Sequence, residues 1–324
     1  MNAHHAPTPS KWAQVPPGIS AVVPVYNGAR DLAELVDRLT PVLGGLGPVY
    51  EIILVNDGSR DDSWDVITSL ARSRAGVHGI CMMRNYGQHN ALLAGIRAAR
   101  YDVIITMDDD LQHPPEELPK LIAKLHDGFD VVYGPPEREQ HGLLRDVASV
   151  VTKIALRSAT HSDVAGMACA LRVFRTQLRD AFAAYRSPFV SIDVLLSWGT
   201  RNFGAVKVRH EPRAHEKSNY TFMKLVRHAI NMMTGFSVLP LQLASLIGFA
   251  FTLFGIGILS YVLGSYLLRG TGVAGFPFLA SIIAIFSGAQ LFALGIMGEY
   301  LARVHFRTMD KPPYTISEQS GGGL

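Results

Sequence analysis

Apolar and polar positions alternate in short blocks through the first 133 residues of the chain. Apolar stretches rich in β-branched residues predict buried strands, and stretches with apolar side chains at helical spacing between them predict helices. The pattern indicates strands at 19–27, 51–55, 79–83, 103–106 and 130–133, and helices at 29–43, from 63 onward, through 91–95 and at 116–127. Strands that alternate with helices of this length imply an α/β fold with a mostly parallel sheet and helices on both faces.

The pattern changes after residue 236, where polar positions become sparse. Residues 239–268 contain no charged side chain, and 276–297 form a second apolar stretch after a short turn. Each stretch exceeds the roughly 20 residues that cross a bilayer of about 30 Å. We therefore expect a two-helix transmembrane hairpin over 236–302. A buried hairpin of a soluble protein is the alternative, and two stretches of this length argue against it.

Residues 220–235 place apolar side chains at helical spacing with Lys224 and Arg227 between them. This pattern predicts an amphipathic helix on the membrane surface, although a soluble core helix has the same pattern. The turn inside the hairpin has only Arg269, whereas more basic residues lie outside it: Lys224, Arg227, Arg303, Arg307 and Lys311. This asymmetry predicts that the α/β domain and both termini are cytoplasmic.

Composition changes this picture little. A net charge of +3 gives no argument for nucleic acid. Cys81 and Cys169 have neither a disulfide framework nor metal-ligand spacing, which fits a reducing compartment. The first residues are polar and rich in His and Pro, typical of a disordered tail rather than a signal peptide. The expected organisation is a disordered tail (1–18), an α/β domain (19–219), an interfacial helix (220–235), a hairpin (236–302) and a cytoplasmic tail (303–324).

Candidate chemistry is concentrated where the predicted strands end. The strand at 103–106 runs into Asp108, Asp109 and Asp110, and three carboxylates at the end of a buried strand are costly unless a cation compensates them. Asp108 and Asp110 are two residues apart, so an extended backbone points both the same way. Hard oxygen ligands of this kind suit Mg²⁺ or Mn²⁺, which bind diphosphates. An acidic turn that caps the next helix has the same composition, and the spacing alone leaves both interpretations open.

Polar residues follow the other predicted strands as well. Because ligands of parallel α/β sheets bind beyond the carboxyl ends of the strands, these residues predict a single site: Tyr26, Asn27, Asp57, Arg84, Asn85, Asp108 and Asp110. Taken alone, Asp57 would fit an ordinary turn with a helix cap. No Gly-x-Gly-x-x-Gly follows the first strand and no Gly-Lys-Ser/Thr is present, so the classical dinucleotide and P-loop modes have no support.

Four motifs, in this order, resemble those of family 2 glycosyltransferases: 22–27 (VVPVYN), 55–59 (VNDGS), 84–88 (RNYGQ) and 108–116 (DDDLQHPPE). With the apolar hairpin they are most similar to the polyprenyl-phosphate subgroup. That subgroup includes dolichyl-phosphate mannose synthase and the bacterial undecaprenyl-phosphate glucosyl and 4-deoxy-4-formamido-L-arabinose transferases. The resemblance covers residues 19–310 and implies a GT-A (Rossmann-like) domain in front of the hairpin.

The resemblance also implies roles at the donor site. The residues that would bind the nucleotide sugar are Pro24, Tyr26, Asn27, Asp57, Arg84 and Asp108. Asp108 and Asp110 match the family's Asp-x-Asp pair, and Gln112 would be a further ligand of Mg²⁺ or Mn²⁺. The middle position is usually Ala in the family. Asp109 stands there in this chain, and we expect it to point to the opposite face and not to bind the metal.

On the acceptor side the resemblance covers residues between the strands and the hairpin. Arg145 matches an arginine that binds the lipid phosphate, and Arg138 matches loosely because Glu139 occupies an often basic position. Asp163 would orient or deprotonate the acceptor, although a phosphate monoester is already ionised at neutral pH. The catalytic residues would thus be Asp110, Asp163 and Arg145, and further phosphate or diphosphate contacts would come from Arg213, Lys217, Ser218 and Tyr220. Glu216 and Asn219 depart from the family's Gly and Lys.

The implied function is inverting transfer of a sugar from a nucleotide sugar, a UDP-sugar, to a polyprenyl phosphate at the bacterial inner membrane. The resemblance also suggests a homo-oligomer, a tetramer. A processive polysaccharide synthase is one alternative, but Trp198 lacks the Gln/Arg-x-x-Arg-Trp context and more spans would be needed. A catalytically inactive scaffold for a lipid-sugar flippase is the other, and the intact Asp57, Asp108 and Asp110 argue against it.

Overall fold

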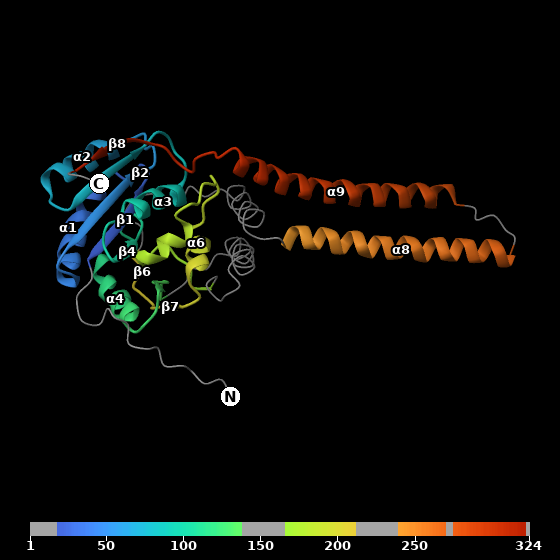
Figure 1. The fold of residues 1–324 in the computed structure, drawn as a ribbon, viewed down its shortest axis with the longest axis horizontal. Coiled ribbons are helices and arrows are strands. Elements are labelled where there is room, and N and C mark those ends of the chain that lie inside the picture. Colours follow the sequence, from blue (N-terminus) through green and yellow to red (C-terminus); the bar gives the residue numbers. More distant parts are fainter. Residues whose placement is uncertain (1–17, 138–165, 212–238, 270–274, 322–324) are drawn as a thin grey trace, which may run out of the picture.

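The computed structural model describes residues 18–137, 166–211, 239–269 and 275–321. Within these ranges one sheet organises the domain, with strands in the order β7-β5-β6-β4-β1-β2-β3-β8 (Figure 1). The strands are β1 (Ile19–Val25), β2 (Tyr50–Asn56), β3 (Val77–Met82), β4 (Val103–Thr106), β5 (Val131–Tyr133), β6 (Arg172–Arg175), β7 (Phe203–Ala205) and β8 (Ile316–Ser320).

The centre of the sheet, β4-β1-β2-β3, is parallel throughout. This part confirms the predicted parallel α/β fold. The edges are mixed: β6 runs antiparallel to both β4 and β5, and β8 runs antiparallel to β3. Because β1, β2, β3 and β4 run the same way, the turns that follow them meet at one edge of the sheet.

Helices cover both faces of the sheet. They are α1 (Leu32–Leu46), α2 (Ser63–Ser73), α3 (Gln88–Ala98), α4 (Leu118–His126) and α6 (Ile192–Gly199), with short 3-10 helices η1 (Pro115–Glu117) and η3 (Thr176–Phe182). Val23 and Leu54 belong to the core beneath α1, α2 and α4. Their neighbours Val22 and Ile53 belong to the core beneath α3 and α6. The strands are therefore apolar on both sides, as expected for a sheet between two helical layers.

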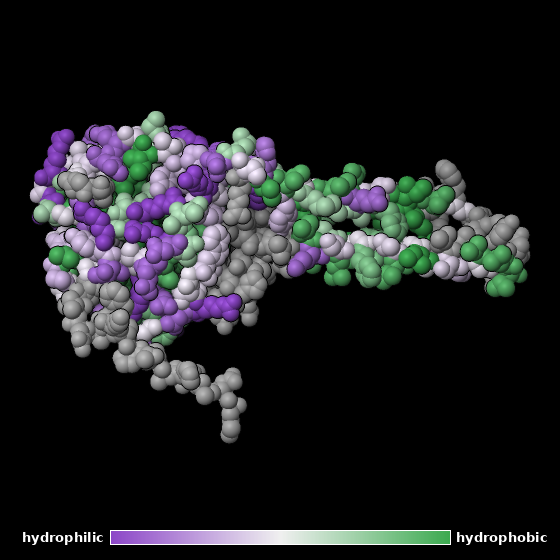
Figure 2. Space-filling model, in the orientation of Figure 1, coloured by the Kyte–Doolittle hydropathy of each residue, from purple (hydrophilic) through white to green (hydrophobic). Residues whose placement is uncertain are grey.

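Two long helices, α8 (Leu239–Arg269) and α9 (Phe276–Thr308), extend side by side from the domain (Figure 1). Within them, Leu241–Ser265 and Ile285–His305 are long and apolar enough to cross a membrane. Phe251 and Phe286 meet between the helices, with ring centroids 5.4 Å apart. Figure 2 shows the hydrophobic colour concentrated on this pair, against a largely hydrophilic domain surface. The predicted interfacial helix at 220–235 lies outside the described residues.

The chain after the hairpin differs from the expected tail over 303–324. α9 continues to Thr308, and 316–320 return to the domain as β8, the edge strand beside β3. The side chains of β8 are almost all exposed. The strand therefore has no apolar alternation that a sequence pattern could register, and it is held chiefly through its backbone.

Candidate active site

The turns after β1 and β2 are joined to each other. Asn27 has a left-handed backbone, with φ of 56°, a conformation that Asn adopts more easily than most residues. Its N–H donates to Ser59 Oγ at 3.0 Å, and its Oδ1 accepts from the N–H of Arg60 at 2.8 Å. Asn27, predicted to bind the nucleotide sugar, therefore uses its amide oxygen to join the two turns. Tyr26, just before it, is 46% exposed.

Asp57 fixes the loop that follows β3. It is 2% exposed, and its two oxygens accept from the N–H groups of Tyr86 (2.7 Å) and Gly87 (2.8 Å). Burial raises the pKa of Asp57, and these two donors counteract part of the rise. Gly58, with φ of 64°, lies so close to the same loop that a Cβ would come within 2.5 Å of the Arg84 carbonyl carbon. Only glycine fits this contact without a shift of the backbone.

The loop between β3 and α3 reaches the acidic turn. Gln88, the first residue of α3, donates through Nε2 to Asp108 Oδ1 at 2.6 Å. Leu111 has a φ of 57°, and this sharp bend brings the N–H of Gln112 back to Asp110 Oδ1 at 3.1 Å. A buried leucine in the left-handed region is strained, and such strain is often found at functional sites.

Asp109 lies against the turn that follows β1. A Cβ built on Gly28 would overlap Asp109 Oδ2, so the glycine makes room for this carboxyl. Burial and the charges of Asp108 and Asp110 raise the pKa of Asp109 to about 7. In the described part of the chain, Asp109 Oδ2 is buried and has no hydrogen-bond partner. The acidic turn is thus a place of concentrated negative charge.

Two histidines that the sequence analysis did not single out lie next to this turn. His113 and His210 form an edge-to-face pair with ring centroids 5.0 Å apart. Burial and the nearby His210 lower the pKa of His113 to about 4, so its ring is neutral at physiological pH. Neither ring nitrogen of His113 has a hydrogen-bond partner among the described residues. His113 belongs to the 108–116 motif. His210 follows β7 in the chain, and no sequence motif includes it.

The remaining predicted donor residues are placed as follows. Pro24 is buried within β1, paired with Val55 of β2. Arg84 is exposed, and its guanidinium lies 4.4 Å from the centroid of the Tyr86 ring. The predicted acceptor and phosphate residues lie outside the described ranges and remain predictions: Arg138, Arg145, Asp163, Arg213, Lys217, Ser218 and Tyr220.

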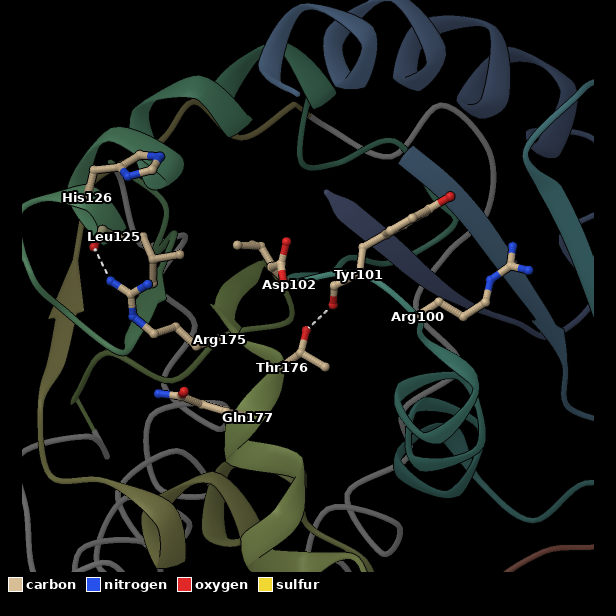
Figure 3. Close-up of a pocket in the computed structure, with 9 residues that line it drawn as sticks. Arg100, Tyr101, Asp102, Leu125, His126, Arg175, Thr176 and Gln177 are labelled. Atoms are coloured by element: carbon tan, nitrogen blue, oxygen red, sulfur yellow. Dashed lines mark hydrogen bonds between the residues drawn. The ribbon is translucent and has the colours of Figure 1, made fainter. Parts of the chain in front are cut away.

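A cavity of about 220 Å³ lies elsewhere, at the amino end of β4 (Figure 3). Its lining includes Asp102, which precedes β4, and Arg175, which ends β6. Arg175 donates to the Leu125 carbonyl at 3.3 Å. The acidic turn follows the carboxyl end of β4, so this cavity and the candidate site lie at opposite ends of that strand.

Comparisons with known proteins agree with this geometry. Residues 20–184 match the family described as glycosyl transferase family 2. The chain is 35% identical to the undecaprenyl-phosphate 4-deoxy-4-formamido-L-arabinose transferase of Shewanella sediminis over 303 residues, 93% of this chain and 92% of that protein. It is 34% identical to the protein of that name from Salmonella paratyphi B over 304 residues, 93% of each chain.

A solved structure shares the fold at lower identity. The glucosyl-3-phosphoglycerate synthase of Mycobacterium tuberculosis has a TM-score of 0.50 and 19% identity, covering 67% of this chain and 78% of that one. Together with the matches over most of the chain, this confirms the resemblance and the GT-A fold that the motifs indicated. The chain belongs to glycosyl transferase family 2.

Proposed function

We propose that this glycosyltransferase moves a sugar from a nucleotide sugar, a UDP-sugar, to undecaprenyl phosphate. One observation carries the proposal: the acidic turn after β4 is tied by Gln88 to the loop after β3, where parallel strands present a ligand site. The names of relatives at 34–35% identity over more than nine tenths of the chain support the acceptor and the reaction class.

The acidic turn fits a divalent cation, Mg²⁺ or Mn²⁺. Asp108, Asp110 and the Gln112 side chain are hard oxygen donors of the kind these ions prefer. The raised pKa of Asp109 and its orphaned Oδ2 report a local excess of negative charge that a cation would relieve. A structure with the same fold at 19% identity is the M. tuberculosis synthase in complex with Mn²⁺, UDP and glucosyl-3-phosphoglycerate. When bound, the ion would neutralise charge on the leaving diphosphate.

Different residues of the chain would bind the nucleotide and the acceptor phosphate. The 83–88 loop, fixed by Asp57, would contact the nucleotide with Tyr26 and Arg84. The acceptor phosphate attacks the anomeric carbon from the side opposite the diphosphate, so the anomeric configuration inverts. Because that phosphate is already ionised, Asp163 would orient it rather than deprotonate it, and cations such as Arg145 would hold it. Arg138, Arg213, Lys217, Ser218 and Tyr220 are the further proposed phosphate contacts.

The two apolar helices have a purpose in this reaction. They would hold the domain at the bacterial inner membrane, with the domain and both termini in the cytoplasm. An anchored enzyme meets a lipid acceptor at high effective concentration, because both diffuse in the same layer. We further propose a homo-oligomer, a tetramer, on the family resemblance alone.

The test is nucleoside diphosphate release by the purified protein in detergent. UDP-, GDP- and dTDP-sugars are supplied with Mg²⁺ or Mn²⁺, with and without undecaprenyl phosphate. Release from one UDP-sugar that requires lipid and metal is the expected result, and mass spectrometry should show one sugar per lipid. A product with many sugars would favour a processive synthase. Donor binding without any release on addition of lipid would favour the scaffold.

A further inference from the structure

The end of the second apolar helix and the chain after it contact the loop before α3 directly at its start and, through Phe189, indirectly at its end. We call residues 303–321, which include the last turns of α9, the return segment, and residues 83–88, which join β3 to α3 and include its first residue, the donor loop. Figure 1 shows the return segment running from the end of α9 back across the domain to β8 at the far edge of the sheet. Residues after the membrane hairpin thus lie beside a loop that precedes it by about 150 residues along the chain.

The first contact is at the start of the donor loop. The N–H of Met83 donates to the carbonyl of Thr315 at 3.0 Å, directly after the ladder in which Cys81 faces Glu318. Tyr314 packs on the same core cluster as Tyr86 of the donor loop. The guanidinium of Arg97, in α3, lies 5.8 Å from the centroid of the Tyr314 ring. The return segment therefore holds β3 where it leaves the sheet and also contacts α3.

The second contact reaches the end of the donor loop indirectly, through the chain around Phe189. Arg303, near the end of α9, lies over the ring of Phe189 at 4.4 Å from its centroid and pairs with Glu299 at 2.9 Å. The chain around Phe189 is bonded to the first turn of α3. There Asn90 Nδ2 donates to the Pro188 carbonyl at 3.4 Å and to the Tyr86 carbonyl at 2.7 Å.

The two contacts converge on the groups that arrange the site. Between them lie the N–H groups of Tyr86 and Gly87 that Asp57 holds, and Gln88, which bonds to Asp108. A shift of the loop at either end would move these groups relative to the acidic turn. The exposed side chains of β8 bury little apolar surface, so its contribution to the stability of the core is small.

We propose that the return segment is a positioning element for the donor loop, through which the membrane anchor supports nucleotide-sugar binding. The inference rests on the proposed function, because it takes the donor to be a nucleotide sugar. The competing explanation is protection: β8 covers the edge of β3, and covered edges prevent aggregation. The two explanations differ in what a substitution changes, since protection affects solubility and stability but not donor affinity.

The test compares Tyr314→Ala and Arg303→Ala in the full-length protein. Tyr261→Ala and Arg72→Ala are the matched controls, because Tyr261 is 71% exposed on α8 and Arg72 is exposed on α2. UDP with Mn²⁺ is the calorimetric probe, and the KM values of donor and lipid acceptor are measured separately. Loss of one cation–π contact and its packing predicts about fivefold weaker UDP binding for Tyr314→Ala. Tyr314→Phe, which keeps the ring, should restore wild-type affinity.

The outcomes separate the two proposals. Weaker UDP binding and a higher donor KM in both variants, with an unchanged KM for the lipid in Tyr314→Ala, supports positioning. If wild-type protein binds neither UDP nor any nucleotide sugar, the proposed function fails. If wild-type protein binds UDP and both variants bind it equally well while their thermal midpoints fall, the return segment only covers the edge and the inference is overturned. If Tyr314→Ala does not fold, Arg303→Ala decides.

Discussion

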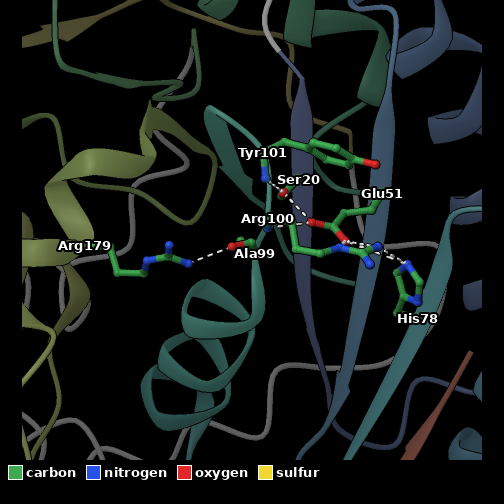
Figure 4. Close-up of polar contacts among 7 residues, drawn as sticks. All are labelled: Ser20, Glu51, His78, Ala99, Arg100, Tyr101 and Arg179. Atoms are coloured by element: carbon green, nitrogen blue, oxygen red, sulfur yellow. Dashed lines mark hydrogen bonds and ion pairs between the residues drawn. The ribbon is translucent and has the colours of Figure 1, made fainter. Parts of the chain in front are cut away.

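Buried carboxylates lie at both ends of the central strands, and only the one at the amino end is compensated by a neighbouring cation among the described residues. At the amino end, Glu51 of β2 is fully buried and accepts from Ser20 Oγ at 2.6 Å, the Arg100 N–H at 2.8 Å and Arg100 Nε at 2.9 Å, while Arg100 Nη2 also lies 2.8 Å from its Oε2 (Figure 4). At the carboxyl end, Asp109 has a buried oxygen without a partner in the described chain and a pKa raised to about 7.

The difference distinguishes a structural charge from a functional one. Glu51 has its compensating charge built into the fold, so nothing from outside is needed. The acidic turn concentrates carboxylates beside a strained backbone at Leu111, and such arrangements are typical of ligand sites. Removing the guanidinium that compensates Glu51 should therefore destabilise the protein, whereas removing a carboxylate of the proposed ligand pair Asp108 and Asp110 should inactivate it.

The largest expected effect is on turnover at the acidic turn. Asp110→Asn removes a negative charge from the proposed metal and diphosphate site, and we expect the rate of sugar transfer to fall by about 10²- to 10³-fold. The thermal midpoint should not fall, since repulsion among the three carboxylates is reduced. Nucleoside diphosphate release and thermal unfolding measure the two quantities.

Asp109→Asn is the matched control for that experiment. It makes the same chemical change one residue away, on the side chain that lies against Gly28. Transfer should stay within about threefold of the wild-type rate, less than 1 kcal/mol. Equal losses in Asp109→Asn and Asp110→Asn would contradict the assignment of Asp108 and Asp110 as the ligand pair.

The next effect is on stability at the amino end. Arg100→Ala leaves the Glu51 carboxylate buried without its guanidinium, and we expect unfolding free energy to fall by about 2 kcal/mol. This is below the usual cost of breaking a buried pair, because the Arg100 side chain is 41% exposed. Urea unfolding measures the loss, and UDP affinity should not change. Adding Glu51→Gln should recover part of the stability, and a double variant as unstable as the sum of the singles would contradict the pairing.

The sequence predicted the carboxyl end better than the amino end. The carboxyl ends of the strands can be recognised in the sequence because each apolar run stops at polar residues. Parallel pairing then places these ends side by side. Glu51 and Ser20 are polar residues inside apolar strands. Their partners Arg100 and His78 lie elsewhere in the sequence, so no local sequence pattern predicts this network. β8 was not predicted for a related reason: its side chains are almost all exposed, so its sequence has no apolar pattern.

The function of individual site residues was harder to predict than their location. Asp57 was expected to contact the nucleotide, and the structure shows both of its oxygens bonded to backbone N–H groups about thirty residues later in the chain. His210 meets His113 only through the fold. Spacing identifies residues that share a strand end, whereas a partner from a distant loop depends on tertiary packing.

A third, smaller effect tests that function of Asp57. Asp57→Asn keeps one acceptor but turns an amide N–H₂ toward the other N–H donor, so one of two charge-assisted bonds is replaced by repulsion. We expect the donor KM to rise about tenfold, or 1.4 kcal/mol, as the loop loosens. Steady-state kinetics with a UDP-sugar measure this change. Asp180→Asn, an exposed position on η3, is the control, and an unchanged KM in Asp57→Asn would show that the loop is held by other contacts.

The smallest expected effect is a pH dependence at the amino end. His78 Nε2 lies 2.8 Å from Arg100 Nη2, and burial followed by the charge of Arg100 lowers the pKa of His78, while Glu51 opposes the shift. The unfolded chain binds a proton near pH 6.5 and the folded chain only at lower pH, so the free energy of unfolding should fall as the pH drops below about 6.5.

His78→Gln removes this titration, so the variant should lose less stability than the wild type between pH 7.5 and 5.5, by an amount below about 1 kcal/mol. The difference between the two proteins is the measurement, because other histidines titrate in both. Urea unfolding across this pH range measures the stability of both proteins. UDP affinity, measured in the same samples, should not differ between them, because His78 lies at the amino end of the strands and the proposed donor site at the carboxyl end. A parallel loss in both proteins would mean that the pKa of His78 is the same in the folded and the unfolded chain, and that the charge of Glu51 cancels the effects of burial and of Arg100.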